Sequence, residues 1–262
     1  MPVVDVATWV GGYPYRHLGD PSADWLVRQM DRLGIARAWV GFLPAAQYRD
    51  PASSTPALHA AIKSHAGRLR AVPTIHPGQV HWENDLNDAV QAGAPAIRVY
   101  PNYLGIDAAG GEMRVLAAAA GAAGIPLVLT VRLEDQRQRH PLDQAGELTT
   151  AGVRALIRSD SQVKLLVSHA ERSFIEEVHW GLTPAESSRI LWDIAWVWGP
   201  PEDHLALLIE TMGIERFVLG TGMPLRIPDT PFARLDLLDL SASQRKQVLE
   251  TNLESWSKMK RE

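Results

Sequence analysis

Short apolar runs, rich in β-branched residues, recur along the chain at regular intervals, and each has the length of a buried strand. Eight such runs are present: VVDVA (3–7), RAWVGF (37–42), LRAVPTI (69–75), AIRVY (96–100), PLVLTVR (126–132), VKLLVS (163–168), ILWDIAW (190–196) and RFVLGT (216–221). The pattern therefore predicts eight β-strands.

Between these runs the apolar positions recur with the spacing of amphipathic helices. We expect helices over 22–34, 54–67, 83–93, 112–124, 143–158, 201–213 and 241–259. Ser22 is a suitable N-cap and Gly34 a suitable C-terminal residue for the first of them. The segment 171–187 reads as a broken helix or a loop.

Strand and helix that alternate eight times over about 250 residues are typical of a (β/α)8 TIM barrel. A doubly wound open sheet is the main alternative, but no G-x-G-x-x-G fingerprint follows any predicted strand. No linker, internal repeat or low-complexity tract divides the chain. We therefore predict a single α/β domain, a (β/α)8 barrel that spans residues 1–262.

Composition narrows the classes of partner. The net charge of −4 gives no basic footprint for nucleic acid, and no apolar run approaches the twenty residues of a membrane span. The chain contains no cysteine, which excludes disulfides and thiolate metal sites and fits a reducing cytoplasm. We expect a small-molecule partner, no nucleic acid and no membrane.

In such a barrel the functional residues lie at the carboxyl ends of the strands, the end called the mouth below. Alternation along strand four places Ala96, Arg98 and Tyr100 on one face, and along strand five it places Val128, Thr130 and Arg132 on one face. Other polar groups expected at the mouth are His76 after strand three, His169 after strand six and Asp193 on strand seven.

Five segments resemble one family: IHPG (75–78), GAPAIRVYP (93–101), VRLEDQRQRHP (131–141), LLVSHA (165–170) and RFVLGTGMP (216–224). They are similar to the amidohydrolase superfamily, and within it to the metal-dependent TIM-barrel hydrolases called amidohydrolase family 2. The resemblance implies a barrel whose histidines and aspartate hold one or two divalent metals that activate water.

Most of the family's metal ligands are missing here. The two histidines of D-x-H-x-H on strand one fall on Ala7 and Trp9, the strand-five histidine falls at or near Thr130, and the strand-eight aspartate falls on Gly222. His169 keeps its place. One imidazole does not hold Zn²⁺, so we expect a degenerate metal site with no metal ligands and no cofactor. We hypothesise that the Trp9 indole occupies the volume of the lost metal and its ligands.

The candidate substrate-binding residues are Arg98, Arg132, Tyr100, Trp9 and His76. Arginine forms a two-pronged contact with carboxylate or phosphate, although a salt bridge of Arg98 to Asp5, Asp193 or Glu134 is an equal alternative. For His76, a simple role in a turn is the favoured interpretation.

The candidate catalytic residues are His169, Glu134, Asp135 and His140. The last three belong to a charged segment after strand five, which either forms a solvated loop or covers the mouth and supplies an acid–base pair.

Two functions fit these residues. The first is an amidohydrolase-like hydrolase or lyase that acts without the usual metal on a small anionic substrate such as a lactone or ester. The second is a barrel that has lost catalysis and binds a ligand or a partner. The missing metal ligands favour the second function, while the arginines and His169 fit either. A homodimer is compatible with the resemblance.

Overall fold

The computed structural model describes residues 2–197 and 203–258. Its eight strands are β1 (Val4–Val10), β2 (Arg37–Phe42), β3 (Leu69–Ala71), β4 (Ile97–Val99), β5 (Leu127–Thr130), β6 (Leu165–Ser168), β7 (Ile190–Asp193) and β8 (Phe217–Val218). Each lies within or overlaps one of the predicted apolar runs.

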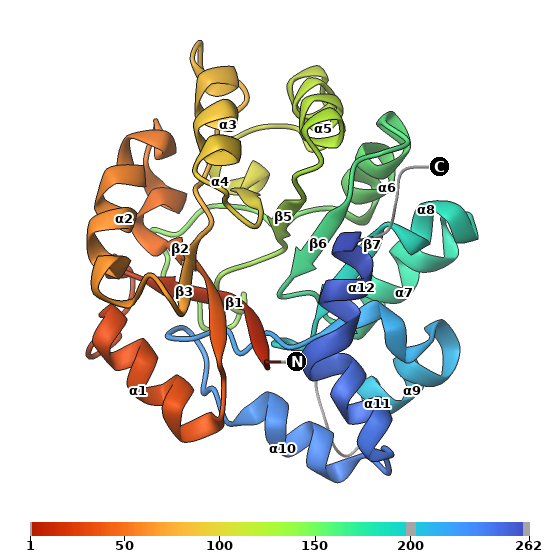
Figure 1. The fold of residues 1–262 in the computed structure, drawn as a ribbon. Helices are drawn as coiled ribbons and strands as arrows, with labels where there is room; N and C mark the ends of the chain where they lie inside the picture. The colour runs from red at the N-terminus through yellow and green to blue at the C-terminus, as the bar shows by residue number, and fades with distance from the viewer. Residues whose placement is uncertain (1, 198–202, 259–262) are drawn as a thin grey trace.

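The helices between the strands form an outer layer (Figure 1). The α-helices are α1 (Ala23–Leu33), α2 (Thr55–Ile62), α3 (Trp82–Gln91), α4 (Pro101–Leu104), α5 (Gly111–Ala123), α6 (Thr150–Ser159), α7 (Arg172–Trp180), α8 (Pro184–Ser188), α9 (His204–Met212), α10 (Thr230–Leu237), α11 (Ala242–Lys246) and α12 (Asn252–Lys258). A π-helical turn, Gln247–Thr251, joins α11 to α12.

The strands are all parallel and form two sheets, with the orders β1-β2-β3 and β4-β5-β6-β7-β8. Isolated bridges, Thr74 with Arg98 and Thr8 with Met223, join the sheets at both of their edges. The eight strands therefore follow one another around a ring (Figure 1). This arrangement confirms the predicted (β/α)8 barrel.

Local sequence signals set most helix ends. Ser22 accepts a hydrogen bond from the Trp25 amide, and Gly34 adopts the left-handed conformation that ends α1. The segment 171–187 is a broken helix, α7 followed by α8. The helix expected over 143–158 was placed too early, because α6 begins at Thr150 after the Thr149 N-cap. The short helix α4 and helix α10 were not predicted.

Strand β1 does not keep a strict alternation of faces. Regular alternation would place Asp5, Ala7 and Trp9 on one face, but the pairing of β1 with β2 shifts between Asp5 and Thr8. The Asp5 side chain accepts hydrogen bonds from the amides of Ala7 and Thr221 and from the Thr221 hydroxyl. A bulge thus turns the Asp5 carboxylate toward the segment after β8, while Ala7 and Trp9 pack at the mouth.

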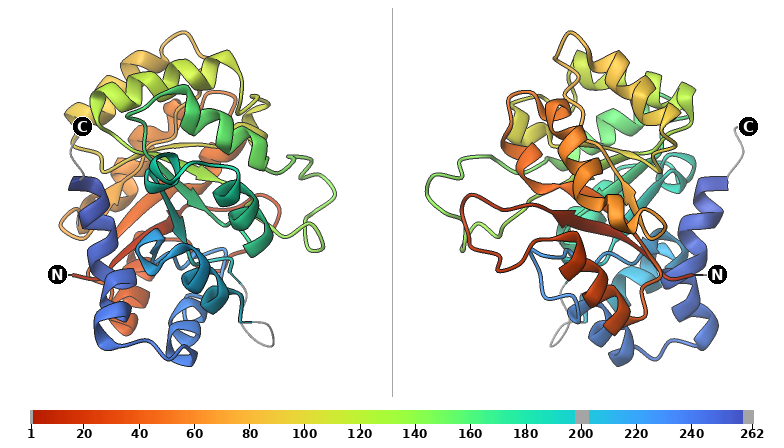
Figure 2. Two further views of the ribbon diagram at one scale, coloured as in Figure 1. Left: turned by 90° about the vertical axis from the view of Figure 1, so that its right-hand side faces the viewer. Right: turned by 60° about the vertical axis from the view of Figure 1, so that its left-hand side comes forward.

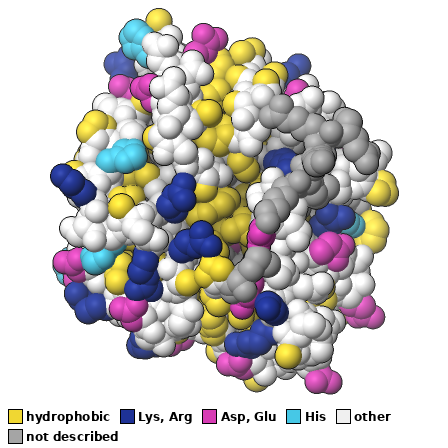
Figure 3. All heavy atoms as spheres, viewed as in Figure 1, with side chains coloured by type: hydrophobic (Ala, Val, Ile, Leu, Met, Phe, Trp, Pro, Cys, Tyr) yellow, Lys and Arg dark blue, Asp and Glu magenta, His cyan; other side chains and the backbone are white. Residues whose placement is uncertain are grey.

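The two ends of the barrel differ. Figure 2 shows the N-terminus and α12 at one end and the long loop after β5 at the other, which is the mouth. Figure 3 shows the end opposite the mouth, where apolar side chains occupy the middle of the face and several Lys and Arg side chains lie beside them. None of the helices within the described residues has the length and hydropathy of a membrane-spanning segment.

Candidate functional site

Arg98 of β4 is the most unusual side chain at the mouth. It is 0% exposed, yet none of its three side-chain nitrogens has a hydrogen-bond partner among the described residues. Its Cζ lies 4.5 Å from the centroid of the Trp9 ring, a cation–π contact. No salt bridge to Asp5, Asp193 or Glu134 forms within this part of the chain, although Arg98 is near enough to Asp193 for its charge to lower the pKa of that carboxyl, which burial raises.

Trp9 is fixed inside the barrel. The indole is 1% exposed, and its Nε1 donates a 2.8 Å hydrogen bond to the Tyr100 hydroxyl. Gly41 on β2 leaves room for it, because a Cβ there would lie 2.9 Å from Trp9 Cδ1. Trp9 and Tyr100 therefore form one rigid unit that packs over Arg98.

His169 lies on the other side of Trp9. The two ring centroids are 5.1 Å apart, and a second indole, that of Trp196, lies 5.4 Å from the imidazole. His169 Nδ1 lies 2.9 Å from the carbonyl oxygen of Arg132. A carbonyl only accepts, so Nδ1 carries the proton and Nε2 presents a lone pair, which has no partner among the described residues.

The His169 backbone and charge are both unusual. Its φ of 59° is in the left-handed region, a strained conformation that costs about 1–3 kcal/mol and is found mainly at functional sites. Burial first, and then the charges of the nearby Arg226, Arg98 and Arg132, lower the pKa of His169 to about 3, while the hydrogen bond to the Arg132 carbonyl opposes this shift. The imidazole is therefore neutral at physiological pH.

The residues at the mouth do not fit a divalent metal. Ala7 and Trp9 are packed in an apolar cluster, and a Cβ on Gly222 would lie 2.6 Å from Arg226 Cγ and 3.1 Å from His169 Nε2. The described residues contain no group of three or more His, Cys, Asp or Glu side chains placed to hold a metal ion. Guanidinium groups take the place of anionic ligands around His169, and they would repel a cation.

The long loop after β5, residues 131–149, covers the mouth. Arg132 forms ion pairs with Glu147 at 2.9 Å and with Glu171 at 3.2 Å. Tyr13, from the loop after β1, donates a 2.8 Å hydrogen bond to Asp143. Figure 2 shows the two loops side by side at this end of the barrel. Arg132 thus anchors the loop and does not carry a free guanidinium.

Among the loop residues predicted to be catalytic, Glu134 is the one that is buried, and both Glu134 and Asp135 are near enough to act on the charge of Arg226. Glu134 is 5% exposed and pairs with Arg16 at 2.8 Å; burial raises its pKa, which Arg16 and Arg226 oppose. Asp135 pairs with the exposed Arg137, and that hydrogen bond lowers its pKa to about 2. His140 is exposed and stacks on Tyr15 at 5.7 Å.

The structure does not bring His76 to the cluster. Its Nδ1 accepts a 3.1 Å hydrogen bond from the Gly78 amide, and the charges that act on it are those of Glu112 and Asp50. This local contact is the turn that we favoured for His76.

Two residues of the cluster were missed in the sequence. Arg226 follows β8 and stacks on Trp196, with Cζ 3.3 Å from the ring centroid; Trp196 follows β7. The signal available was an arginine and a tryptophan within a few residues of strand ends. Together the side chains form a continuous series of contacts at the mouth, in the order Arg98, Trp9, His169, Trp196 and Arg226, in which Trp9 and His169 meet edge to face.

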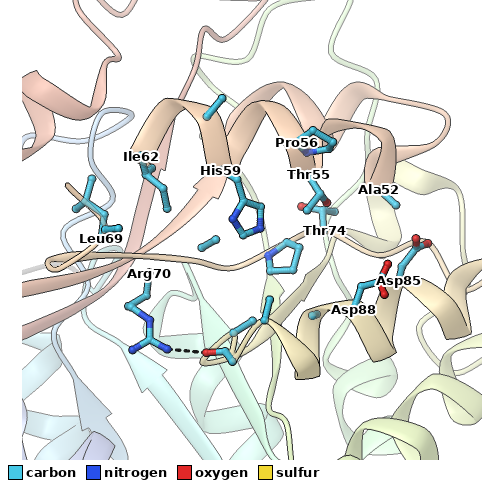
Figure 4. Close-up of a pocket in the computed structure, with 18 of the residues that line it drawn as sticks. Ala52, Thr55, Pro56, His59, Ile62, Leu69, Arg70, Thr74, Asp85 and Asp88 are labelled. Atoms are coloured by element: carbon cyan, nitrogen blue, oxygen red, sulfur yellow. Dashed lines mark hydrogen bonds between the residues drawn. The ribbon is translucent and has the colours of Figure 1, made fainter. Parts of the chain in front are cut away.

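A groove of about 700 Å³ lies elsewhere, on the outside of β3 between α2 and α3. Figure 4 shows His59 on α2 and the carboxylates of Asp85 and Asp88 on α3, with Arg70 hydrogen-bonded to the Gly93 carbonyl. None of the predicted site residues lines this groove. Its size therefore does not make it the candidate site.

No protein-family model matches the sequence, and no curated protein matches it. Solved structures do match. A dihydroxybenzoic acid decarboxylase from Polaromonas sp. JS666, with bound manganese and 2-nitroresorcinol, has a TM-score of 0.75 and 15% identity, covering 100% of this chain and 98% of its own. A 5-carboxyvanillate decarboxylase from Sphingomonas paucimobilis has a TM-score of 0.71 and 13% identity, covering 97% and 98%.

A probable 2-pyrone-4,6-dicarboxylic acid hydrolase from Acinetobacter baumannii, with citric acid bound, has a TM-score of 0.69 and 10% identity, covering 98% of this chain and 99% of its own. At these identities the likeness shows the fold. The chain has the TIM-barrel fold of these solved structures, which is the fold that its sequence pattern predicted.

Proposed function

We propose that this barrel is an enzyme of the hydrolase or lyase kind that acts on a small anionic substrate without a metal ion. The observation that carries this proposal is Arg98, a fully buried guanidinium whose nitrogens have no partner among the described residues. Burying an unpaired cation is costly, so a site that keeps one is suited to an anion. The structurally similar decarboxylases and hydrolase are named for carboxylic acids, which supports the same chemistry.

His169 is the proposed general base. Three arginines lower its pKa, and an anion bound to Arg98 would offset part of that positive charge and raise the basicity of Nε2. Side-chain acid–base catalysis contributes about 10²–10⁴-fold, which suits an activated bond such as that of a lactone or ester. The loop over the mouth would exclude bulk water, and Glu134, Asp135 and His140 stay candidates for the acid.

The second candidate function is ligand binding without turnover. The replacement of the family's ligand positions by Ala7, Trp9, Thr130 and Gly222 favours it, since water then has no metal to activate it. Arg98 would bind an anion under either function.

A panel of lactones, carboxylate esters and carboxylic acids separates these functions. We expect wild-type protein to turn over at least one of them and His169→Gln to lose turnover while its affinity changes little. Arg98→Met should lose both affinity and turnover. Binding without turnover by the wild type would support the second function, and unaltered anion affinity of Arg98→Met would refute both.

Two expectations from the sequence also stay predictions. The lack of cysteine favours a reducing cytoplasm, which fluorescent tagging would test, and light scattering would test for the homodimer.

A further inference from the structure

One layer of the barrel interior has an unusual composition. The layer below it is apolar, with one residue from each strand run: Val6, Trp39, Val72, Ala96, Val128, Leu166, Leu191 and Val218. The unusual layer is formed by the residues that lie two positions further along each run, or one position further in β1 because of its bulge. These residues are Ala7, Gly41, Thr74, Arg98, Thr130, Ser168, Asp193 and Gly220. Bulky aliphatic side chains normally fill such layers, but this one contains only small or polar residues.

The glycines of this layer make room for the larger side chains beside them. A Cβ on Gly41 would lie 3.5 Å from Arg98 Cζ, and a Cβ on Gly220 would lie 2.6 Å from Asp193 Cβ and 2.9 Å from Ala7 Cβ. Side chains at these positions would displace the two charged groups. The interior of an eight-stranded barrel is wide enough for packed side chains or for one small ligand.

Hydroxyl groups flank Arg98 on both neighbouring strands. Thr74 forms the bridge with Arg98 and also borders the groove outside β3 (Figure 4). Thr130 lies two residues beyond Val128, the β5 partner of Arg98. Thr74 is 2% exposed and Thr130 is 0% exposed, and neither Oγ1 has a hydrogen-bond partner within the described ranges. Three adjacent strands thus present buried donors that the described part of the protein does not use.

The other side of the layer presents an acceptor. Asp193 is 0% exposed, and its Oδ1 accepts hydrogen bonds from the Ala195 amide at 3.0 Å and the His169 amide at 3.3 Å. Its Oδ2 has no partner in the described part of the chain; the Ser168 hydroxyl is near, but no hydrogen bond of normal geometry joins the two side chains.

We propose that this layer is a binding site for a short hydroxycarboxylate, with the carboxylate held by Arg98, Thr74 and Thr130 and the hydroxyl donated to Asp193 Oδ2. This inference rests on the proposed function, because it assigns the substrate class of the same site. The layer matches both ends of such a ligand: a guanidinium and two hydroxyl donors face one end, and a carboxylate oxygen faces the other. Trp9 and Tyr100 cover the ligand from the mouth.

Calorimetry with two matched pairs of acids tests the proposal: glycolate against acetate, and 3-hydroxypropionate against propionate. For wild-type protein we expect the hydroxy acid to bind roughly tenfold tighter in at least one pair, the effect of a hydrogen bond to a charged group. Thr74→Val and Thr130→Val should each weaken both members of that pair by roughly three- to tenfold. Thr130→Ser keeps the hydroxyl group and should bind both acids with the wild-type affinity.

Asp193→Asn tests the proposed contact with the ligand hydroxyl most directly. Its Oδ1 still accepts from the two amides, while an amide nitrogen replaces the free oxygen and cannot accept from the ligand hydroxyl. We expect the preference for the hydroxy acid to vanish and the affinity for the plain acid to stay within about threefold. Thr8→Val is the matched control, because this buried hydroxyl already donates to the Trp39 carbonyl and lies outside the layer. It should keep the wild-type preference.

Circular dichroism and thermal unfolding identify any variant that fails to fold. The assignment of this layer would be overturned if folded Asp193→Asn kept the preference for the hydroxy acid. It would also be overturned if Thr74→Val and Thr130→Val both bound the acids like the wild type. Wild-type protein that binds none of the four acids would overturn it as well. If Arg98→Met instead binds the acids as the wild type does, the proposed function itself fails.

Discussion

Replacing Arg98 by methionine should make the protein more stable while it removes anion binding. The guanidinium is fully buried without a hydrogen-bond partner in the described part of the chain, and such a cation costs several kcal/mol, taken as about 4 kcal/mol. The Trp9 ring at 4.5 Å and the charge of Asp193, whose pKa the guanidinium lowers, together return about 2 kcal/mol. Methionine fills a similar volume without charge, so we expect a gain of about 2 kcal/mol, or roughly 4–8 °C in Tm for a chain of this length.

Differential scanning calorimetry without and with glycolate measures both effects. Wild-type Tm should rise with glycolate concentration, whereas the higher Tm of Arg98→Met should not change. Arg132→Met is the matched control: this side chain is also buried, but it pairs with Glu147 and Glu171. Because both partners are partly exposed, its loss should destabilise the fold by about 1–3 kcal/mol. A clear fall in the Tm of Arg98→Met would show that Arg98 is structural and would refute the reasoning.

Four further predictions concern the same end of the barrel. The pKa of His169 is about 3, below its ordinary 6.5, so between these pH values the unfolded chain binds a proton that the folded chain does not. The free energy of unfolding should therefore fall as the pH drops from about 6.5 to 3. His169→Gln should reduce this pH dependence in urea titrations. Burial raises the pKa of Asp5 to about 7 from 3.8, so Asp5 has the opposite sign: stability should fall as the pH rises from about 4 to 7, and Asp5→Asn should remove that loss. Gly222→Ala should cost about 2–3 kcal/mol of unfolding free energy, since φ is +76° and Arg226 Cγ would lie 2.6 Å from the new Cβ. Gly105→Ala is the control and should cost about 1 kcal/mol, because Gly105 has a φ of +67° but open space around it. Equal costs for the two variants would contradict the packing argument. Arg16→Ala removes the ion pair with Glu134 and the hydrogen bond to the Leu225 carbonyl, and stopped-flow tryptophan fluorescence should show glycolate associating roughly threefold faster; an unchanged rate would mean that this contact does not limit access.

The hydrophobic pattern alone predicted the barrel. RAWVGF coincides with β2, and the outward residues Ile97, Val99, Leu127 and Leu129 pack in the cluster that contacts the helices, as their alternation required. Ser22 and Gly34 marked the ends of α1 because capping depends only on a few neighbouring residues. The inward direction of Arg98 and Thr130 followed from the same alternation.

The partners of these inward residues were decided by the tertiary structure. Arg98 and Arg132 carry the same charge and face the same mouth. Arg132 pairs with one acid from the loop and with Glu171, which precedes α7, while Arg98 lies against Trp9. The bulge arises in the pairing of β1 with β2, and the Asp5 carboxylate then meets Thr221, which is more than two hundred residues away in the sequence. The sequence determined the periodicities of its strands and helices, because these are set by nearest neighbours along the chain. Only the closed arrangement of strands decided which charges were paired, because that depends on residues distant in sequence that meet across the barrel.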